Sequence, residues 1–294
     1  MNPIKRGIHA LEVLQRPLDG IRSLEACYGA THLSGPRPTI CKVTLAPELD
    51  PSGIVIRELC ARGIVVAAGH SDASYKQMQS AVESGVTMVT HLFNAVRQPH
   101  HREPGIFGIL GAQEQVKRPF FGIIADNIHI HPSMVSLAHE AHPEGMILVS
   151  DAMAMLGLPD GEYEWTNEET IVKKGGELTL KGLKTIAGRY VELRFKAWLA
   201  VLIAGSCVTL VECLNNMLKW TETDVAGAVG AVTSTPAKML GIEETKGTLR
   251  TGADADLVVL SESTDKDGKT MLTVDEVWKF GEKVHSAWKS TAKL

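Results

Sequence analysis

The chain has 294 residues, of which 44% are hydrophobic and 22% are charged, and its formal net charge is -4. This is an ordinary globular composition, long enough for one α/β barrel or two smaller domains. The mild acidity and the lack of a basic run exclude a nucleic-acid footprint. The longest uncharged apolar stretch, Ala197–Val211, has 15 residues, fewer than the roughly 20 that a membrane-spanning helix needs.

The cysteines and the N-terminal residues indicate the compartment. The five cysteines form no CxxC pair and leave an odd number, so we expect buried thiols rather than a disulfide framework. The first residues, MNPIKRGIHALEV, contain no apolar run typical of a signal peptide. We therefore expect a cytoplasmic protein.

Strand-like and helix-like segments alternate from Cys41 onward, whereas no complete strand–helix unit is evident before it. Five apolar runs, each followed by a helix-like segment or a long loop, predict an α/β protein with a (β/α) barrel or a doubly wound sheet. The runs lie at 41–49, 63–72, 86–95, 120–132 and 145–155. The clearest helix-like segments are 54–62, 74–83 and 132–142.

The second half of the chain is more varied. Residues 159–180 are rich in turns and predict a small β excursion, while 208–219 and 224–240 have helical composition. Two glycine turns and a short buried strand are expected between 245 and 260, followed by a hairpin around Gly281. We therefore divide the chain at residue 245, with a β-rich tail over 246–294.

Two of the apolar runs end on a histidine. His70 follows GIVVAAG and His91 follows VTMVT, 21 residues later. Parallel strands end at the same edge of a sheet, so these imidazoles could share one divalent metal, zinc or a similar ion. The alternative is two unrelated loop histidines that make structural hydrogen bonds.

Other strand ends carry further candidates, each with a simpler alternative. Asp151 could act as a general acid and base, or be a turn or N-cap aspartate. His129 could touch a substrate or be a polar residue leaving a strand. Arg102 could bind an anion or be a solvated loop arginine, and His9 lies in a segment that could simply fray.

Seven short motifs in order resemble one family. GHSDA, VTHLFNA, REPG, GIIADNIH, LVSDAM, IAGS and KGTLRTGADADLVVL follow one another as in the N-acetylglucosamine-6-phosphate deacetylases of the amidohydrolase superfamily. The resemblance runs from about Lys5 to Trp278. It implies a metal-dependent (β/α) TIM-type barrel, of which about five C-terminal βα units are recognisable, a companion β-sandwich that includes the tail, and a homodimer.

The resemblance also implies roles for single residues, carried over from the matching motif positions. His70 and His91 would bind the metal, and Asp151 would be the general acid and base. Arg102 would reach the substrate phosphate in the neighbouring subunit. The remaining substrate contacts would be His9, Asn94, Ala95 and His129.

Two departures from the family pattern matter. The HLEGPF segment, whose glutamate is the third protein ligand of the metal in the family, has no counterpart, and Met1 stands about where that segment ends. We therefore expect a chain shortened at its N-terminus, with an incomplete barrel. In addition, Arg189–Gly205 interrupts a loop where family members run from KTIAG straight into a serine, and the tripeptide IAG occurs on both sides of it.

Two hypotheses follow. The first is metal-dependent hydrolysis of the acetamide of N-acetylglucosamine 6-phosphate, with Glu48 as a possible replacement for the missing ligand. The alternative is a non-catalytic fragment or pseudoenzyme that binds sugar phosphate or a full-length partner. A related metal amidohydrolase acting on a cyclic amide is disfavoured, because REPG and FNA suit a phosphosugar better and no carboxylated-lysine motif is evident.

Overall fold

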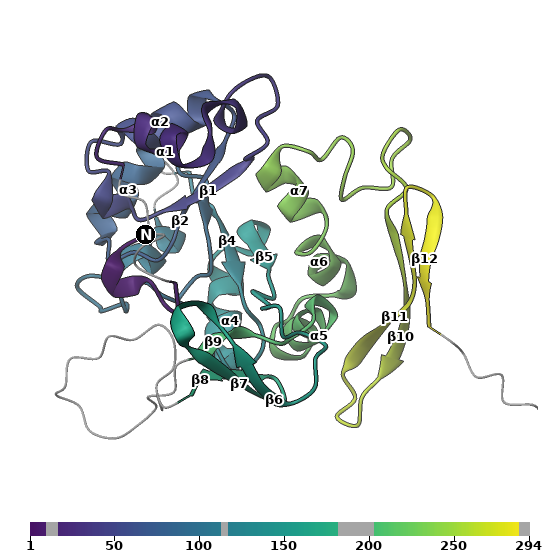
Figure 1. Cartoon of the computed structure of the whole chain (residues 1–294). Helices are drawn as coiled ribbons and strands as arrows, with labels where there is room; N and C mark the ends of the chain where they lie inside the picture. Colours follow the sequence, from purple (N-terminus) through teal and green to yellow (C-terminus); the bar gives the residue numbers. More distant parts are fainter. Residues whose placement is uncertain (10–16, 113–116, 182–202, 288–294) are drawn as a thin grey trace, which may run out of the picture.

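Five parallel strands form the centre of the protein, whose computed structural model (Figure 1) describes residues 1–9, 17–112, 117–181 and 203–287. Their order in the sheet is their order in the chain, with every pair parallel. Each lies within one of the five predicted runs, which confirms the α/β architecture. The strands are β1 (Lys42–Leu45), β2 (Val65–Ala68), β3 (Met88–Val89), β4 (Phe120–Ile123) and β5 (Met146–Leu148).

Helices connect the strands and follow the sheet, and several of them begin at a residue whose side chain caps the first turn. In α3, the Ser74 hydroxyl accepts from the Gln77 amide while the Gln77 side chain accepts from the Ser74 amide, so both unsatisfied amides find partners. Thr209 and Glu212 make the same capping box at the start of α5. The helices are α1 (Ile21–Tyr28), α2 (Ile54–Ala61), α3 (Tyr75–Ser84), α4 (Pro132–Ala141), α5 (Leu210–Trp220), α6 (Val225–Gly230) and α7 (Ser234–Leu240).

One predicted helix, 224–240, is wrong in its extent. It is two short helices, α6 and α7, because Thr233 between them has a non-helical backbone (φ -130°, ψ -83°). The Thr233 hydroxyl donates to the Val229 carbonyl oxygen at 2.7 Å, and such local bonds compete with helix continuation.

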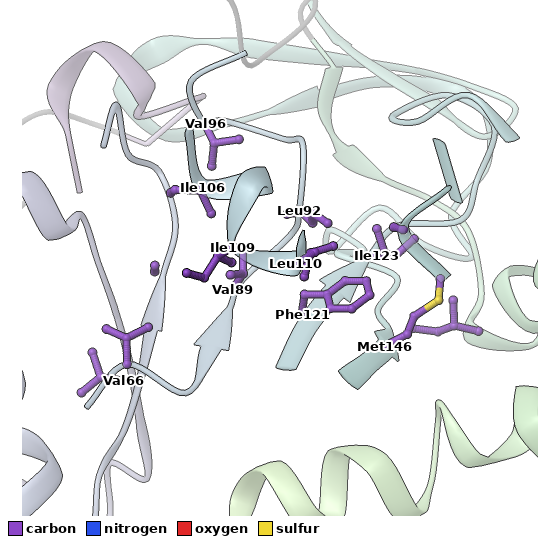
Figure 2. Packing of buried hydrophobic residues seen from close by; sticks show 14 of the residues in the cluster. Val66, Val89, Leu92, Val96, Ile106, Ile109, Leu110, Phe121, Ile123 and Met146 are labelled. Atoms are coloured by element: carbon purple, nitrogen blue, oxygen red, sulfur yellow. The ribbon is translucent and has the colours of Figure 1, made fainter. Parts of the chain in front are cut away.

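The main core lies between the sheet and its helices. Val66, Val89, Phe121 and Ile123 are fully buried there. Figure 2 shows them spread along the sheet, with Phe121 next to Met146 of the neighbouring strand. The strands β2, β3, β4 and β5 are buried along almost their whole length, as expected for a parallel sheet covered on both faces.

A second sheet follows β5. It is antiparallel, in the order β6-β7-β8-β9, and confirms the predicted β excursion at 159–180. Its buried side chains pack against Ile8 and Met153. The strands are β6 (Gly161–Glu164), β7 (Thr170–Lys174), β8 (Glu177–Leu180) and β9 (Ile203–Ser206). Of the inserted stretch at 189–205, only 203–205 lie within the described residues, at the start of β9.

The tail forms a third sheet, which lies beyond α5, α6 and α7 in Figure 1. Its antiparallel strands are β10 (Leu257–Thr264), β11 (Thr270–Lys279) and β12 (Glu282–Ser286). The expectation of a buried strand here is wrong, because β10 and β12 are largely exposed. Asn215 of α5 holds the sheet, since its side chain accepts from the Leu272 amide at 2.8 Å and donates to the Leu272 carbonyl at 2.9 Å.

The expectation of buried thiols is also only partly right. All five cysteines are free, but Cys27 and Cys41 are exposed and only Cys213 is buried. Burial raises the pKa of the Cys213 thiol to about 12, so it is unreactive near neutral pH. Within the described ranges, none of the helices is long and apolar enough to span a membrane.

Gly122 in β4 provides a test of the packing between β3 and β4. A Cβ atom there would lie 2.1 Å from the Thr90 carbonyl oxygen, whereas a Cβ at exposed Gly111 would have no neighbour within 4 Å. We expect Gly122→Ala to lower the free energy of unfolding by about 3 kcal/mol, the upper end for overpacking, and Gly111→Ala to have little effect. Urea denaturation of both variants measures this, and equal midpoints would contradict the described packing.

Candidate functional site

Polar residues gather where β2, β3, β4 and β5 end. Each of these strand ends is followed by a residue with a left-handed backbone: φ is 48° at His70, 73° at Phe93, 62° at Asn127 and 48° at Asp151. This region costs energy for residues with a Cβ atom and persists only where surrounding contacts hold it. Strained turns of this kind cluster at functional sites, so this edge of the sheet is the candidate site.

His70 and His91 meet at this edge, as predicted from their positions. Their Nε2 atoms are 3.0 Å apart, and the residues are only 8% and 6% exposed. The Nδ1 atom of His70 lies 2.8 Å from the Lys5 carbonyl oxygen. A carbonyl can only accept, so Nδ1 of His70 carries the proton and its Nε2 presents a lone pair.

Both imidazoles are neutral near pH 7. Burial, together with the neighbouring His91, lowers the pKa of His70 to about 3. Burial also lowers the pKa of His91, although the nearby Asp151 carboxylate opposes this. In the described contacts, the buried Nδ1 of His91 has no hydrogen-bond partner.

The pair fits a divalent metal as two of its ligands. Neutral imidazoles whose Nε2 atoms converge are typical zinc ligands, and two nitrogens on a tetrahedral zinc lie about 3.3 Å apart. The Lys5 carbonyl also orients His70 as partners of metal-bound histidines do. However, no group of three or more His, Cys, Asp or Glu side chains is arranged to hold a metal among the described residues. The described part of the chain therefore offers two candidate ligands at this edge and no third grouped with them.

His129 is held by a neighbour whose part the sequence did not reveal. Its Nδ1 donates to Asp126 Oδ2 at 2.6 Å, and Asp126 Oδ1 accepts from the amides of Ile128 and His129. Burial opposes ionisation of Asp126, but these hydrogen bonds outweigh it and hold the pKa of that carboxyl below its ordinary value. Since Nδ1 is engaged, Nε2 of His129 is the nitrogen left for another partner.

Asp151 lies on the turn that follows β5, and it is exposed. Its carbonyl oxygen accepts from the Ser206 amide at 3.1 Å, and the Ser206 hydroxyl donates to the Ser150 carbonyl. The carboxylate acts electrostatically on both His9 and His91. The structure thus brings Asp151 close to the histidine pair. Its turn is held by Ser206, the residue that directly follows the inserted stretch 189–205.

The remaining predicted residues divide into two groups. The His9 ring lies 5.3 Å from that of His70, centroid to centroid. Asn94 and Ala95 lie three and four residues after His91, and the Asn94 amide donates to the His91 carbonyl at 3.1 Å. Arg102 is different: it is exposed in the loop after β3, and its guanidinium makes no ion pair with a described residue.

Glu48 does not present a free carboxylate to the histidines. One of its oxygens accepts from Asn2 Nδ2 and the Asp72 amide, and the other from the Ser71 hydroxyl. Its oxygens are thus occupied by the loop that follows His70, which argues against the replacement-ligand hypothesis.

The fold places a pair of neutral histidines at the strand ends of an α/β sheet. A model of the amidohydrolase family matches residues 55–284. The chain belongs to the amidohydrolase family.

Among curated proteins, the mouse and human N-acetylglucosamine-6-phosphate deacetylases are 39% and 38% identical to the chain over 278 and 277 residues. Each alignment covers 93% of this chain but only 62% of the relative. The chain therefore spans less than two thirds of the length of these relatives.

Solved structures show the same likeness. The N-acetylglucosamine-6-phosphate deacetylase of Thermotoga maritima is 25% identical, with a TM-score of 0.75 over 98% of this chain and 68% of its own. A variant of the Mycobacterium smegmatis enzyme, in complex with N-acetyl-D-glucosamine-6-phosphate, is 31% identical, with a TM-score of 0.67 over 84% of this chain and 58% of its own.

The Asp126–His129 pair gives a pH-dependent prediction. Because the pKa of Asp126 is lower in the folded protein, its ionised form stabilises the fold above the unfolded pKa of about 4, and this is lost as the pH falls through the folded value. We expect Asp126→Asn to lower the free energy of unfolding by about 1–3 kcal/mol at pH 7, and the difference from the parent to shrink below about pH 4. Urea denaturation across this range measures it.

The control for this prediction is Asp19→Asn, at an exposed aspartate, which should follow the parent at every pH. A difference between Asp126→Asn and the parent that stays constant from pH 7 to pH 3 would contradict the assignment.

Proposed function

We propose that the chain catalyses hydrolysis of the acetamide of N-acetylglucosamine 6-phosphate, giving glucosamine 6-phosphate and acetate. The observation that carries the proposal is the convergence of the His70 and His91 Nε2 atoms, 3.0 Å apart, at the strand edge that also carries Asp151. The names of the relatives support the substrate and favour the deacetylase over a non-catalytic alternative.

His70 and His91 would hold one divalent metal ion, with zinc the first choice for two neutral imidazoles. Such an ion would make a bound water more acidic and polarise the acetamide carbonyl. The Lys5 carbonyl keeps the His70 ring turned so that Nε2 points to His91.

Asp151 is the proposed general acid and base. Its exposed carboxylate would accept the proton of the attacking water and then deliver it to the amine nitrogen as the carbon–nitrogen bond breaks. His129, oriented by its bond to Asp126, would direct Nε2 at the substrate. In its doubly protonated form, beside the Asp126 carboxylate, it would donate its Nε2–H to the carbonyl oxygen on which negative charge develops.

The sugar phosphate would be bound by the surrounding loops. We assign His9, Asn94 and Ala95 to contacts within one subunit, because all three adjoin the histidine pair. Exposed Arg102 suits the same task in a neighbouring subunit, since a guanidinium can bind phosphate oxygens bidentately. The chain would therefore act as a homodimer.

The architecture of the relatives extends the proposal to the whole chain. We propose that β1–β5 are units of an incomplete TIM-type barrel within residues 1–245, and that 246–294 belong to a small β-sandwich. The T. maritima structure supports this through its TM-score of 0.75. A cytoplasmic location suits a phosphorylated sugar as substrate.

The role of Asp151 can be tested directly. We expect Asp151→Asn to reduce acetate release from N-acetylglucosamine 6-phosphate by about 10²–10⁴-fold, the usual share of a general acid–base group, while zinc content stays unchanged. Asp19→Asn is the control on an exposed aspartate. Acetate is measured in a coupled assay with added zinc, and a parent chain that is folded and metal-loaded yet inactive would contradict the proposal.

Arg102 can be tested by mixing variants. Arg102→Ala and Asp151→Asn subunits are each expected to be nearly inactive alone. In a mixed dimer, the Arg102→Ala subunit keeps Asp151 and would receive Arg102 from its partner, so about a quarter of parental activity should return after subunit exchange. No recovery in dimers shown to have exchanged would place Arg102 within its own site or outside any site.

A further inference from the structure

We propose that Glu48 is a positioning residue that holds the loop carrying His70, and through it the histidine pair, in the arrangement that a metal requires. The inference rests on the proposed role of His70 as a metal ligand. It replaces the hypothesis that Glu48 is itself a ligand.

The position of Glu48 follows from the register of the first two strands. Leu45 of β1 is paired with Ala68 of β2, and the Gly69 amide donates to the Leu45 carbonyl at 3.1 Å. The strands therefore end level, with Glu48 three residues beyond the last pair on one strand and His70 two residues beyond it on the other.

The Glu48 carboxylate binds the two residues that follow His70. The Ser71 hydroxyl donates to Oε2 at 2.6 Å, and the Asp72 amide donates to Oε1 at 2.6 Å. Hydrogen bonds of this length to an ionised acceptor are among the strong ones in proteins. Asn2 closes the arrangement, because its side chain donates to Glu48 Oε1 at 2.8 Å and its amide donates to the His70 carbonyl at 2.8 Å.

The conformation of His70 explains why this support is needed. Its φ of 48° lies in the left-handed region, which a non-glycine residue keeps only under constraint. Glu48 binds the residues directly after His70 and, through Asn2, the His70 carbonyl. The backbone is thus held at the His70 carbonyl and at the two residues after it by Glu48 and Asn2, while the Leu45 carbonyl holds the Gly69 amide before it. The imidazole direction is therefore set before any metal arrives.

The same loop connects to the other histidine. The Ser71 amide donates to the Ala95 carbonyl at 3.0 Å, and the Arg97 amide donates to the Ser71 carbonyl at 3.2 Å. Ala95 lies four residues after His91, so Ser71 lies between Glu48 and the loop that follows the second imidazole. One carboxylate therefore supports both sides of the pair.

The experiment compares Glu48→Ala and Glu48→Gln with the parent. Glutamine keeps an oxygen for Asn2 and Asp72, and its amide can donate to the Ser71 hydroxyl, which also accepts. Glu83→Ala, at an exposed glutamate of α3, is the matched control. Circular dichroism and thermal melting establish that each protein is folded.

Two measurements are made, neither of which uses activity. Long-range proton–nitrogen correlation spectra of the metal-free proteins report which ring nitrogen of His70 carries the proton. Calorimetric titration with zinc chloride reports the dissociation constant. We expect Glu48→Ala to lose the defined Nδ1–H form of His70 and to bind zinc at least 10-fold more weakly. Glu48→Gln should keep both properties within about threefold of the parent.

Two results would overturn the proposal. If Glu48→Ala keeps the His70 tautomer, Glu48 does not position the ring. If Glu48→Gln is folded and behaves like Glu48→Ala, the negative charge of Glu48 is what matters, as expected for a direct metal ligand.

A parent chain that binds zinc but releases no acetate would contradict the deacetylase proposal alone. If the parent binds no zinc, the tautomer comparison still decides on Glu48.

Discussion

The approach of two neutral imidazoles to 3.0 Å is the constraint around which the rest of the site is arranged. Two lone pairs repel, so without a metal one ring must present a proton to the other. Because the Lys5 carbonyl holds the His70 proton on Nδ1, the donor is Nε2 of His91, which leaves His91 Nδ1 unprotonated. Binding of a metal would require the His91 proton to leave Nε2, since both Nε2 atoms would then need lone pairs. Nδ1 of His91, which has no hydrogen-bond partner in the part of the chain that the structure describes, can accept the displaced proton.

The same edge of the sheet stores backbone strain. Left-handed residues occur after β2, β3, β4 and β5, and each of these turns carries side chains proposed to act on substrate or metal. Hydrogen bonds to the turns offset the cost of this strain. Asp126 makes them within its own turn, and Ser206 of β9 donates to the Asp151 carbonyl.

Much of this could be predicted from the sequence, for physical reasons. A buried parallel strand is a short apolar run, so the five strands and the histidines that end β2 and β3 were evident from their composition. Burial of β10 was predicted wrongly, because an apolar run does not show whether anything covers it. The surroundings of Glu48 could not be predicted for a related reason: its three donors come from residues 2, 71 and 72, and such non-local contacts leave no local pattern. The Asp126–His129 pair, by contrast, spans three residues, and an Asp-x-x-His signal after a strand could have revealed it.

Helix α5 has two neighbouring asparagines whose side chains bind different parts of the structure. Asn215 holds Leu272 of the tail sheet, while Asn216 donates to the Ala125 carbonyl at 2.8 Å, directly before Asp126. The tail and the turn that orients His129 are therefore attached to consecutive residues of one rigid helix. A shift of the tail relative to the body would be transmitted along a single turn of α5 to the carboxyl end of β4. A sheet that contributes no residue to the site can thus still determine how steadily that site is held.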